Sequence, residues 1–467
     1  LSEVMEPSIT YARNGYPVVP RITATIDTVH ELFSTEWKTS ADIYLPNGKP
    51  PVPGSIFKNP AMANTYEKII REAEGIKGNR EKQIDHARAI WYRGWIAEEI
   101  DQFCRDQDVM DVSGRRHKGL LTGEDMANWE ATYDKPVTYD YGNYTVCKCG
   151  PWSQGPVLLQ QLAILDSLGV DSMDPTGPDF VHTVVESAKL AFADREAYYG
   201  DPAFIDVPMT ELLSPEYNER RRALIGKQAS EKLIPGKIEG YLGSIDKAID
   251  DRSGITAAAS LGAGEPTVAK TGVSTGDTVH LDIIDRFGNM VSCTPSGGWL
   301  QSSPIIPKLG FCLGNRGQMF WLDKNSPSAL VPGKRPRTTL SPSLALKDGK
   351  PFMVFGTPGG DQQDQWSALM FLHHADHRMN LQESIDCPAF HTDHFPSSFW
   401  PRAYQSKKVV LEGRFPDSTI AELRRRGHDI EIGEPWSEGR LTAASSDGAI
   451  LKAAANARGM QGYAAGR

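Results

Sequence analysis

The sequence predicts a fold of the α+β class, because its helix-like and strand-like segments are grouped rather than alternating. The first quarter is mostly helix-like, and residues 79–107 carry apolar side chains at helical spacing. From about residue 278 to residue 360, strand-like runs separated by Gly and Pro turns dominate. Two further helix-like runs follow, ALMFLHHADHRM (368–379) and TIAELRRRG (419–427).

Length and composition indicate a folded protein with an ample core. The 467 residues suffice for one large domain or two ordinary ones, and 40% hydrophobic with 23% charged residues is globular composition. The net charge is −9 and the basic residues form no stripe, which argues against a nucleic-acid partner. No apolar run approaches the roughly 20 residues that a membrane-spanning helix needs.

The start of the chain and the cysteines leave the cellular compartment open. Leu1 is followed at once by helix-like sequence, which predicts that the N-terminal part is truncated or processed, together with any targeting signal. Cys147 and Cys149 are spaced C-x-C, and no C-x-x-C pair occurs. We therefore expect small buried side chains at all six cysteines: Cys104, Cys147, Cys149, Cys293, Cys312 and Cys387.

The middle of the chain reads as a strand, a loop, two helices and an exposed segment. GNYTVC (142–147) is strand-like, and GPWSQGP (150–156) is a loop before the helix-like VLLQQLAILDSL. Residues 180–202 form a second helix, ended by Gly200 and Pro202. Residues 228–277 are rich in Gly, Ser, Ala and Thr, which predicts an exposed, mobile segment.

The stretch GDTVHLDIIDRFGNMVS, which begins at Gly276, predicts a β-hairpin headed by Thr278. A hydroxyl residue at the head of a buried strand, after a mobile segment, is what N-terminal nucleophile hydrolases require. Cleavage of the Asp277–Thr278 bond would free an α-amine, which can act as general base for the same hydroxyl. Threonine is also simply a good strand former, so this stretch alone leaves both interpretations open.

Two later turns carry groups suited to binding anions. In KRPRTTLSPSLAL (334–346), Arg335, Arg337, Thr338 and Thr339 could hold a carboxylate, or could form a solvated turn. In VFGTPGGDQQ (354–363), paired glycines allow backbone N–H groups to converge on an oxyanion. The same residues also fit a plain tight turn.

The clustered histidines could suggest zinc, because His373 and His377 have i,i+4 spacing. The Glu of an H-E-x-x-H motif is missing and no cysteine pair supplies further ligands. We expect these histidines, with His374, to lie on a surface helix, and His391 and His394 to bind no metal. The sequence indicates no metal and no cofactor.

Seven segments together resemble the γ-glutamyltransferase family of N-terminal nucleophile hydrolases, in the family's order. They are EPSITYARNGYPV (6–18), WYRGWIAEEI (91–100), GLLTGEDMANWEA (119–131), FADREAYYGDP (192–202), TVHLDIIDRFGNMVS (278–292), KRPRTTLSP (334–342) and GTPGG (356–360). The resemblance implies an αββα four-layer sandwich. It also implies self-cleavage into a large subunit (1–277) and a small subunit (278–467) that together form one domain and can pair as a homodimer. A periplasmic or extracellular location would follow the family.

The resemblance also implies roles for individual residues. Thr278 would be the nucleophile, supported by the hydroxyl of Ser296; Thr338 and Thr339 would hold the substrate carboxylate, and Gly359 and Gly360 would form the oxyanion hole. The family's Arg that pairs with the substrate α-carboxylate precedes the region matching Leu1, so Arg335 or Arg337 is left open as a replacement.

The chain departs from the family where the substrate ammonium is received. Gly298 stands where the family has Asn, and Arg316 and Met319 stand where it has a Gln and an Asp; a shifted register brings Gln318 nearby but supplies no Asp. GPWSQGP also replaces the family's double-Ser/Gly-Gly loop. Neither Arg nor Met can accept from an ammonium as a carboxylate does, and an unpaired buried charge is costly.

These departures predict an amidohydrolase for a small-molecule dicarboxylic-acid monoamide without the α-amine, such as a glutaryl or oxamate-type amide. Two alternatives stay open. One is ordinary γ-glutamyl transfer and glutathione hydrolysis, and the other is an inactive homologue that keeps the fold for binding.

Overall fold

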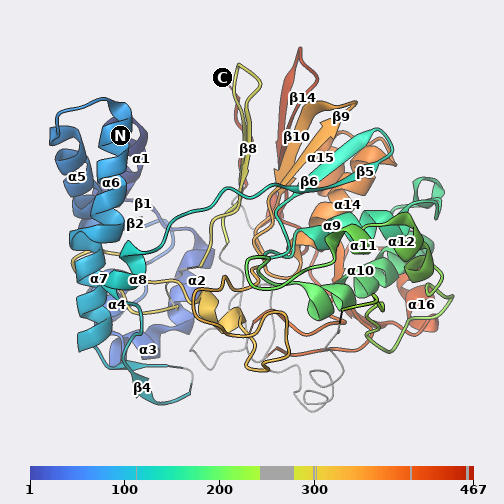
Figure 1. Ribbon diagram of the computed structural model, residues 1–467, viewed down its shortest axis with the longest axis horizontal. Helices are drawn as coiled ribbons and strands as arrows, with labels where there is room; N and C mark the ends of the chain where they lie inside the picture. Colours follow the sequence, from blue (N-terminus) through green and yellow to red (C-terminus); the bar gives the residue numbers. More distant parts are fainter. Residues whose placement is uncertain are drawn as a thin grey trace. The chain divides into compact units, whose positions relative to one another are not determined.

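The structure is a computed structural model that describes residues 1–111, 113–241, 278–297, 300, 302–399, 402–458 and 462–466 (Figure 1). The chain forms two compact units. The first contains Leu1–Tyr133 and Gly297–Asn315, and the second contains the other described residues. The mixture of helices and strands confirms the predicted α+β class. In the described part, no helix combines the length and the apolar character that crossing a membrane requires.

The first unit is built mainly from helices. Its helices are α1 (Ser2–Asn14), α2 (Pro20–Thr28), α3 (His30–Thr35), α4 (Lys38–Tyr44), α5 (Pro60–Gly75), α6 (Arg80–Arg93), α7 (Trp95–Asp106) and α8 (Gly123–Ala127). Two short antiparallel pairs accompany them, β1 (Tyr16–Pro17) with β2 (Ile56–Phe57) and β3 (Val109–Met110) with β4 (Arg116–His117). The continuous helix expected over 79–107 is instead two helices, because Gly94 adopts an extended conformation between them.

The second unit is centred on a six-stranded antiparallel sheet with strand order β15-β14-β10-β9-β6-β5. In chain order these strands are β5 (Val137–Tyr141), β6 (Tyr144–Lys148), β9 (Ser343–Lys347), β10 (Lys350–Gly356), β14 (Thr442–Ser446) and β15 (Leu451–Ala455). A smaller sheet joins β11 (Phe390–Thr392) antiparallel and β13 (Asp429–Ile432) parallel to β12 (Lys408–Leu411). The strand predicted at 142–147 is confirmed as β6.

Helices cover one face of the large sheet. The helices of this unit are α9 (Pro156–Leu165), α10 (Pro178–Tyr198), α11 (Met209–Leu212), α12 (Pro215–Arg222), α14 (Gln363–Ala375), α15 (Leu381–Asp386) and α16 (Asp417–Arg425). Phe355 of β10 stacks on Phe371 of α14, with ring centroids 5.9 Å apart. The helices predicted at 157–168, 180–202, 368–379 and 419–427 are confirmed as α9, α10, α14 and α16.

The predicted hairpin lies on the opposite face of the sheet. It consists of β7 (Leu281–Ile284) and β8 (Met290–Cys293), with Leu281 opposite Cys293. Because side chains alternate along a strand, Gly356 faces away from the helices when Phe355 faces them. The hairpin side chain of His280 lies against Gly356. The described order is therefore helices, sheet and hairpin, and the complete four-layer sandwich stays a prediction.

Two expectations need correction, and one falls largely outside the described residues. The histidine-bearing helix α14 is buried from Gln363 to His373, not on the surface, because it packs against the large sheet and against its neighbouring helices α9 and α15. The cysteines are free, but Cys104 alone is buried; Cys293 is exposed and the other four are half-buried. Of the segment expected to be mobile (228–277), residues 242–277 lie outside the described part.

Candidate active site

The two hydroxyl residues proposed for catalysis lie together at the open end of the β7–β8 hairpin. Thr278 precedes β7 and Ser296 follows β8, and the Thr278 hydroxyl donates to the Ser296 hydroxyl at 3.2 Å. Both residues are half-buried, so a substrate can reach them. Asp277, on the other side of the predicted cleavage bond, and Gly298 lie outside the described residues.

His280 fixes the head of the hairpin on the end of β10. A Cβ atom on Gly356 would lie 2.4 Å from the His280 ring, so only glycine permits this approach. The His280 Nε2 atom lies 3.0 Å from Asp282, whose carboxylate also accepts from the Thr442 hydroxyl at 2.9 Å. The chain continues from Gly356 into residues 357–361, called here the Gly-Gly loop, so His280, two residues after Thr278, lies at the start of this loop.

Both glycines of the Gly-Gly loop are required by their surroundings. Gly359 has φ +131°, a conformation that disfavours side chains, and a Cβ there would lie 3.2 Å from the Trp366 ring. A Cβ on Gly360 would lie 2.7 Å from the ring of Phe399. The two glycines therefore allow the rings of Trp366 and Phe399 to pack directly on the backbone of this loop.

Thr338 and Thr339 lie in a buried turn that precedes β9; we call residues 338–341 the Thr-Thr turn. The Thr338 N–H donates to the Trp152 carbonyl at 2.9 Å, and the alternative of a solvated turn is wrong, since both threonines are buried. The Thr338 hydroxyl accepts from the Leu340 N–H at 3.2 Å. Among the described residues, the Thr339 hydroxyl oxygen is buried without a hydrogen-bond partner. Within the described residues, neither hydroxyl therefore donates its proton to a protein acceptor.

Arg335 and Arg337 are engaged by carboxylates of the protein. Arg335 is 2.7 Å from Asp134 and 2.9 Å from Asp201. Arg337 is only 3% exposed and pairs with Glu196 at 2.7 Å. Burial lowers the pKa of Arg337 although Glu196 acts to raise it. The Arg337 charge is therefore engaged by Glu196, and Arg335 is divided between two aspartates.

Arg316 and Met319 lie on a short 3-10 helix, η4 (Arg316–Met319), next to the Gly-Gly loop. The Arg316 guanidinium carbon is 5.8 Å from the centroid of Phe399, the same ring that borders Gly360. Its Nη1 atom donates to the Met319 sulfur at 3.7 Å, and Met319 is 1% exposed. The Gln318 carbonyl accepts from Arg402 at 2.9 Å, which fixes η4. Arg316, predicted from the resemblance to stand where the substrate ammonium is received, therefore lies near the Phe399 ring that borders Gly360.

A buried charge network supports the Gly-Gly loop, and sequence reasoning assigned it no role. Arg195 pairs with Asp361 at 2.5 Å and with Glu196 at 2.7 Å. Burial alone would raise the pKa of Asp361, but Arg195 and hydrogen bonds from the Ser398 hydroxyl and N–H lower it below its usual range. Two signals were present in the sequence: charged residues within the helix 180–202, and the family-like segment FADREAYYGDP, which contains Arg195 and Glu196.

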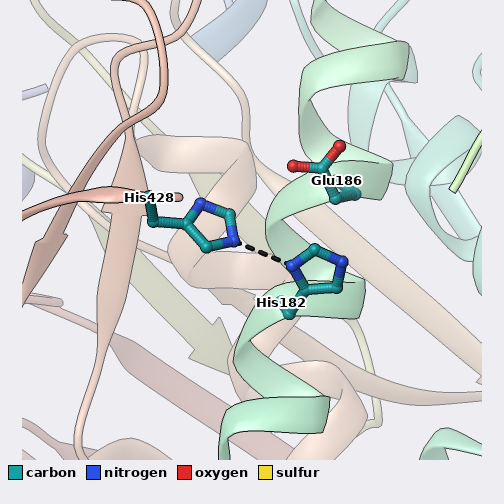
Figure 2. Close-up of side chains that lie close together, drawn as sticks. All are labelled: His182, Glu186 and His428. Atoms are coloured by element: carbon teal, nitrogen blue, oxygen red, sulfur yellow. Dashed lines mark hydrogen bonds between the residues drawn. The ribbon is translucent and has the colours of Figure 1, made fainter. Parts of the chain in front are cut away.

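A second polar cluster joins α10 to β13, and Figure 2 shows its three side chains. Within the described residues, His182, Glu186 and His428 are the one group whose ligand atoms lie close enough for a metal, all within 4.8 Å. His182 Nε2 donates to the Gly226 carbonyl at 2.9 Å, so His182 Nδ1 accepts from His428 Nε2 at 2.8 Å. Lys189 neutralises Glu186 at 2.6 Å. The lone pair of His182 Nδ1 is thus occupied and the facing His428 Nε2 carries a proton, whereas the buried His428 Nδ1 has no hydrogen-bond partner among the described residues. With the nitrogens facing each other in this way, the cluster fits a hydrogen-bonded pair of histidines better than a metal site.

The histidines considered for zinc also have protein partners. His373 Nδ1 lies 3.3 Å from the Ser384 carbonyl, and the His377 ring packs on Phe180. Burial alone would lower the pKa of His391, but Glu438, at 2.6 Å, and Asp393 raise it to about 10.

Known proteins share this architecture along the whole chain. The family model described as Gamma-glutamyltranspeptidase matches residues 1–466. The oxamate amidohydrolase proenzyme of Klebsiella pneumoniae is 31% identical over 461 residues, which cover 97% of this chain and 72% of that protein. The glutathione hydrolase-like YwrD proenzyme of Bacillus subtilis is 30% identical over 435 residues, covering 92% and 70%.

Solved structures agree with these relatives. The structure of LmbA2991HD has a TM-score of 0.89 at 50% identity and covers 100% of this chain and 78% of that one. The cephalosporin acylase from Bacillus halodurans has a TM-score of 0.74 at 27% identity, covering 97% and 72%. The fold is accordingly that of the N-terminal nucleophile hydrolases. The chain belongs to the gamma-glutamyltranspeptidase family and is an amidohydrolase-type enzyme of that family.

Proposed function

We propose that this protein cleaves itself before Thr278 and then hydrolyses an amide with Thr278 as the N-terminal nucleophile. The contact that carries the proposal is the 3.2 Å hydrogen bond between the hydroxyls of Thr278 and Ser296, beside the Gly-Gly loop. The word proenzyme in the names of the curated relatives supports processing of the precursor. Cleavage would yield a large subunit (1–277) and a small subunit (278–467).

Self-cleavage uses the same hydroxyl as catalysis. The Thr278 oxygen attacks the carbonyl carbon of Asp277, the peptide C–N bond breaks, and the proton moves to the released α-amine. Water then hydrolyses the ester, which leaves the Asp277 carboxylate and a free Thr278. An α-amine has an ordinary pKa near 8, so it can accept a proton at working pH.

In turnover, the freed amine takes the proton of the Thr278 hydroxyl while the oxygen attacks the substrate amide. Ser296 orients that oxygen, and the N–H groups of Gly359 and Gly360 stabilise the negative charge on the former carbonyl oxygen. The amine leaves with the proton, and the acyl ester on Thr278 is hydrolysed by water to a carboxylic acid. Preorganised donors of this kind are each worth about 10²–10³-fold in rate.

The acyl donor we infer is a dicarboxylic-acid monoamide without an α-amine. The hydroxyls of Thr338 and Thr339 offer two protons to its free carboxylate. Arg316 attracts an anion and repels an ammonium at the place where γ-glutamyl donors carry their amine. The relative from Klebsiella pneumoniae is named for oxamate, an amide that has a carboxylate and no amine.

The substrate class is tested with three anilides of matched leaving group: γ-glutamyl, glutaryl and oxalyl. We expect kcat/KM for at least one of the two amine-free donors to exceed that for the γ-glutamyl donor by tenfold or more. A preference for the γ-glutamyl compound would instead support the alternative function, ordinary glutathione hydrolysis. Two relatives from Bacillus subtilis are named for that activity. Absence of turnover in a fully cleaved protein would favour the inactive homologue.

A further inference from the structure

We propose that Gln363 is a positioning residue that fixes the direction of the Gly360 N–H in the Gly-Gly loop, and that Gln154 supports it by holding the following peptide plane. This inference rests on the proposed function, in which that loop binds the oxyanion. Glycine has the widest backbone freedom of any residue, so two adjacent glycines do not hold their peptide planes by themselves. The planes must be fixed from outside the loop if the donors are to be preorganised.

Gln363 holds the first plane. Its Oε1 atom accepts from the Ser341 N–H at 3.2 Å, and because a backbone N–H can only donate, the orientation of the amide group is set. Its Nε2 atom donates to the Gly359 carbonyl. In a trans peptide the carbonyl and the N–H point in opposite directions. Fixing the Gly359 carbonyl therefore fixes the N–H of Gly360.

Gln154 holds the next plane. Its Oε1 atom accepts from Arg195 Nη1 at 2.9 Å, and arginine can only donate, so the Nε2 atom is turned toward the Gly360 carbonyl at 3.2 Å. Arg195 also binds the side chain of Asp361. The loop, the glutamine and the arginine thus form a closed ring of contacts around one peptide plane.

The preceding plane is held from within the loop, because the Thr357 hydroxyl donates to the Pro358 carbonyl at 2.8 Å. Three successive carbonyls therefore have side-chain donors, and the N–H of Gly359 is fixed by the first of them. Both glutamines are fully buried and so have no competing water.

The same two glutamines connect the Gly-Gly loop to the Thr-Thr turn. The Gln154 backbone N–H donates to the Thr338 carbonyl at 2.9 Å, and Gln363 accepts from Ser341. They therefore fix the oxyanion site relative to the turn proposed to hold the substrate carboxylate. Gln154 lies in GPWSQGP, a loop in which the sequence departs from the family pattern. The hydrogen bond from Gln154 to the Gly-Gly loop therefore occurs together with the altered substrate-binding residues.

The test compares Gln363→Met with the control Gln365→Met. Gln365 is also buried on α14 and also makes two backbone hydrogen bonds, donating to Thr392 at 3.1 Å and accepting from it at 2.8 Å, but it does not contact the Gly-Gly loop. For the best substrate of the anilide panel, we expect Gln363→Met to lower kcat about 10–100-fold with KM within about threefold, since the donors are misdirected rather than removed. Gln365→Met should keep kcat within about twofold at a similar loss of Tm.

Gln154→Met is the second variant. It frees the plane that carries the Gly360 carbonyl and the Asp361 N–H, but that carbonyl also accepts from the Gln363 N–H at 3.2 Å, so kcat should fall less than in Gln363→Met, at nearly constant KM. The proposal is overturned if the glutamine variants that fold keep the kcat of the wild type, or if the control loses kcat to the same degree. If neither variant folds, Gln363→Glu decides, because it keeps the acceptor for Ser341 and loses the donor to Gly359. A wild-type protein that is cleaved but turns over no anilide would overturn the proposed function itself, which separates the two failures.

Discussion

At the scale of single residues, the candidate site combines a preserved reaction centre with an altered recognition site. Thr278 and Ser296 contact each other through their hydroxyls, and the loop of Gly359 and Gly360 follows the strand on which the hairpin lies. Arg316 occupies the position expected to meet the substrate amine. The chemistry and the choice of substrate are therefore separable by mutation.

The double substitution Arg316→Gln with Met319→Asp should restore binding of an ammonium. It replaces a repelling cation by an acceptor and supplies an anion, and a hydrogen bond to a charged group contributes about 1.5–3 kcal/mol. We expect the ratio of kcat/KM for γ-glutamyl-anilide to that for glutaryl-anilide to rise at least tenfold, measured by steady-state kinetics. Arg316→Lys, which keeps the cation, is the matched control. An unchanged ratio in the double variant would remove Arg316 and Met319 from substrate selection.

Some of these residues could be predicted from the sequence and others could not. Thr278 and Ser296 flank one hairpin, so local pairing alone brings them together. The contact between Gln154 and Gly360 joins residues 206 positions apart, and no local pattern encodes it. The sequence left Arg337 open as a substrate ligand for the same reason, since only the tertiary fold shows that Glu196 engages it.

At the scale of elements, the buried helix α10 carries residues of two polar clusters in the second unit. It is buried along nearly its whole length and carries Arg195 and Glu196 of the network behind the Gly-Gly loop. About one turn from its start, His182 contacts His428 beside β13. Buried polar groups on such a helix must be satisfied by specific partners, which makes its stability sensitive to protonation.

Acid should destabilise the protein partly through His428. Burial first, and then nearby cations, lower its pKa from 6.5 to about 3; the facing groups are His182, Glu186, Lys189, His394 and Arg426. The unfolded chain therefore binds a proton more readily than the folded one below pH 6.5. The contribution of neutral His428 is fully present above pH 6.5 and is lost as the pH falls toward 3, by up to about 1.4 kcal/mol per pH unit.

Urea denaturation from pH 7 to pH 4.5 measures this contribution. His428→Gln removes the titrating group and can keep a donor toward His182, so its free energy of unfolding should fall less steeply with acidification than that of the wild type. Two parallel curves would show that His428 does not titrate differently in the folded and unfolded states.

At the scale of the whole molecule, the fold class could be predicted from the grouping of helices and strands. Which helices are buried could not be predicted in this way. The histidine run was expected on a surface helix, yet α14 packs against the large sheet, α9 and α15 and buries His373. The second unit gathers the hairpin, the Gly-Gly loop and the Thr-Thr turn at one end of the large sheet, because β9 begins where the antiparallel β10 ends. Sheet topology, rather than any single motif, therefore assembles the candidate site.

The measurement that tests the central claim most directly is a denaturing gel of the purified protein with N-terminal sequencing of its bands. We expect two fragments, residues 1–277 and 278–467, the second beginning with Thr278, whereas Thr278→Ala remains one chain because it lacks the attacking hydroxyl. Thr278→Ser keeps that hydroxyl and should still be cleaved. A folded wild-type protein that stays whole, or a second fragment that begins at another residue, would contradict the assignment of Thr278 as the nucleophile.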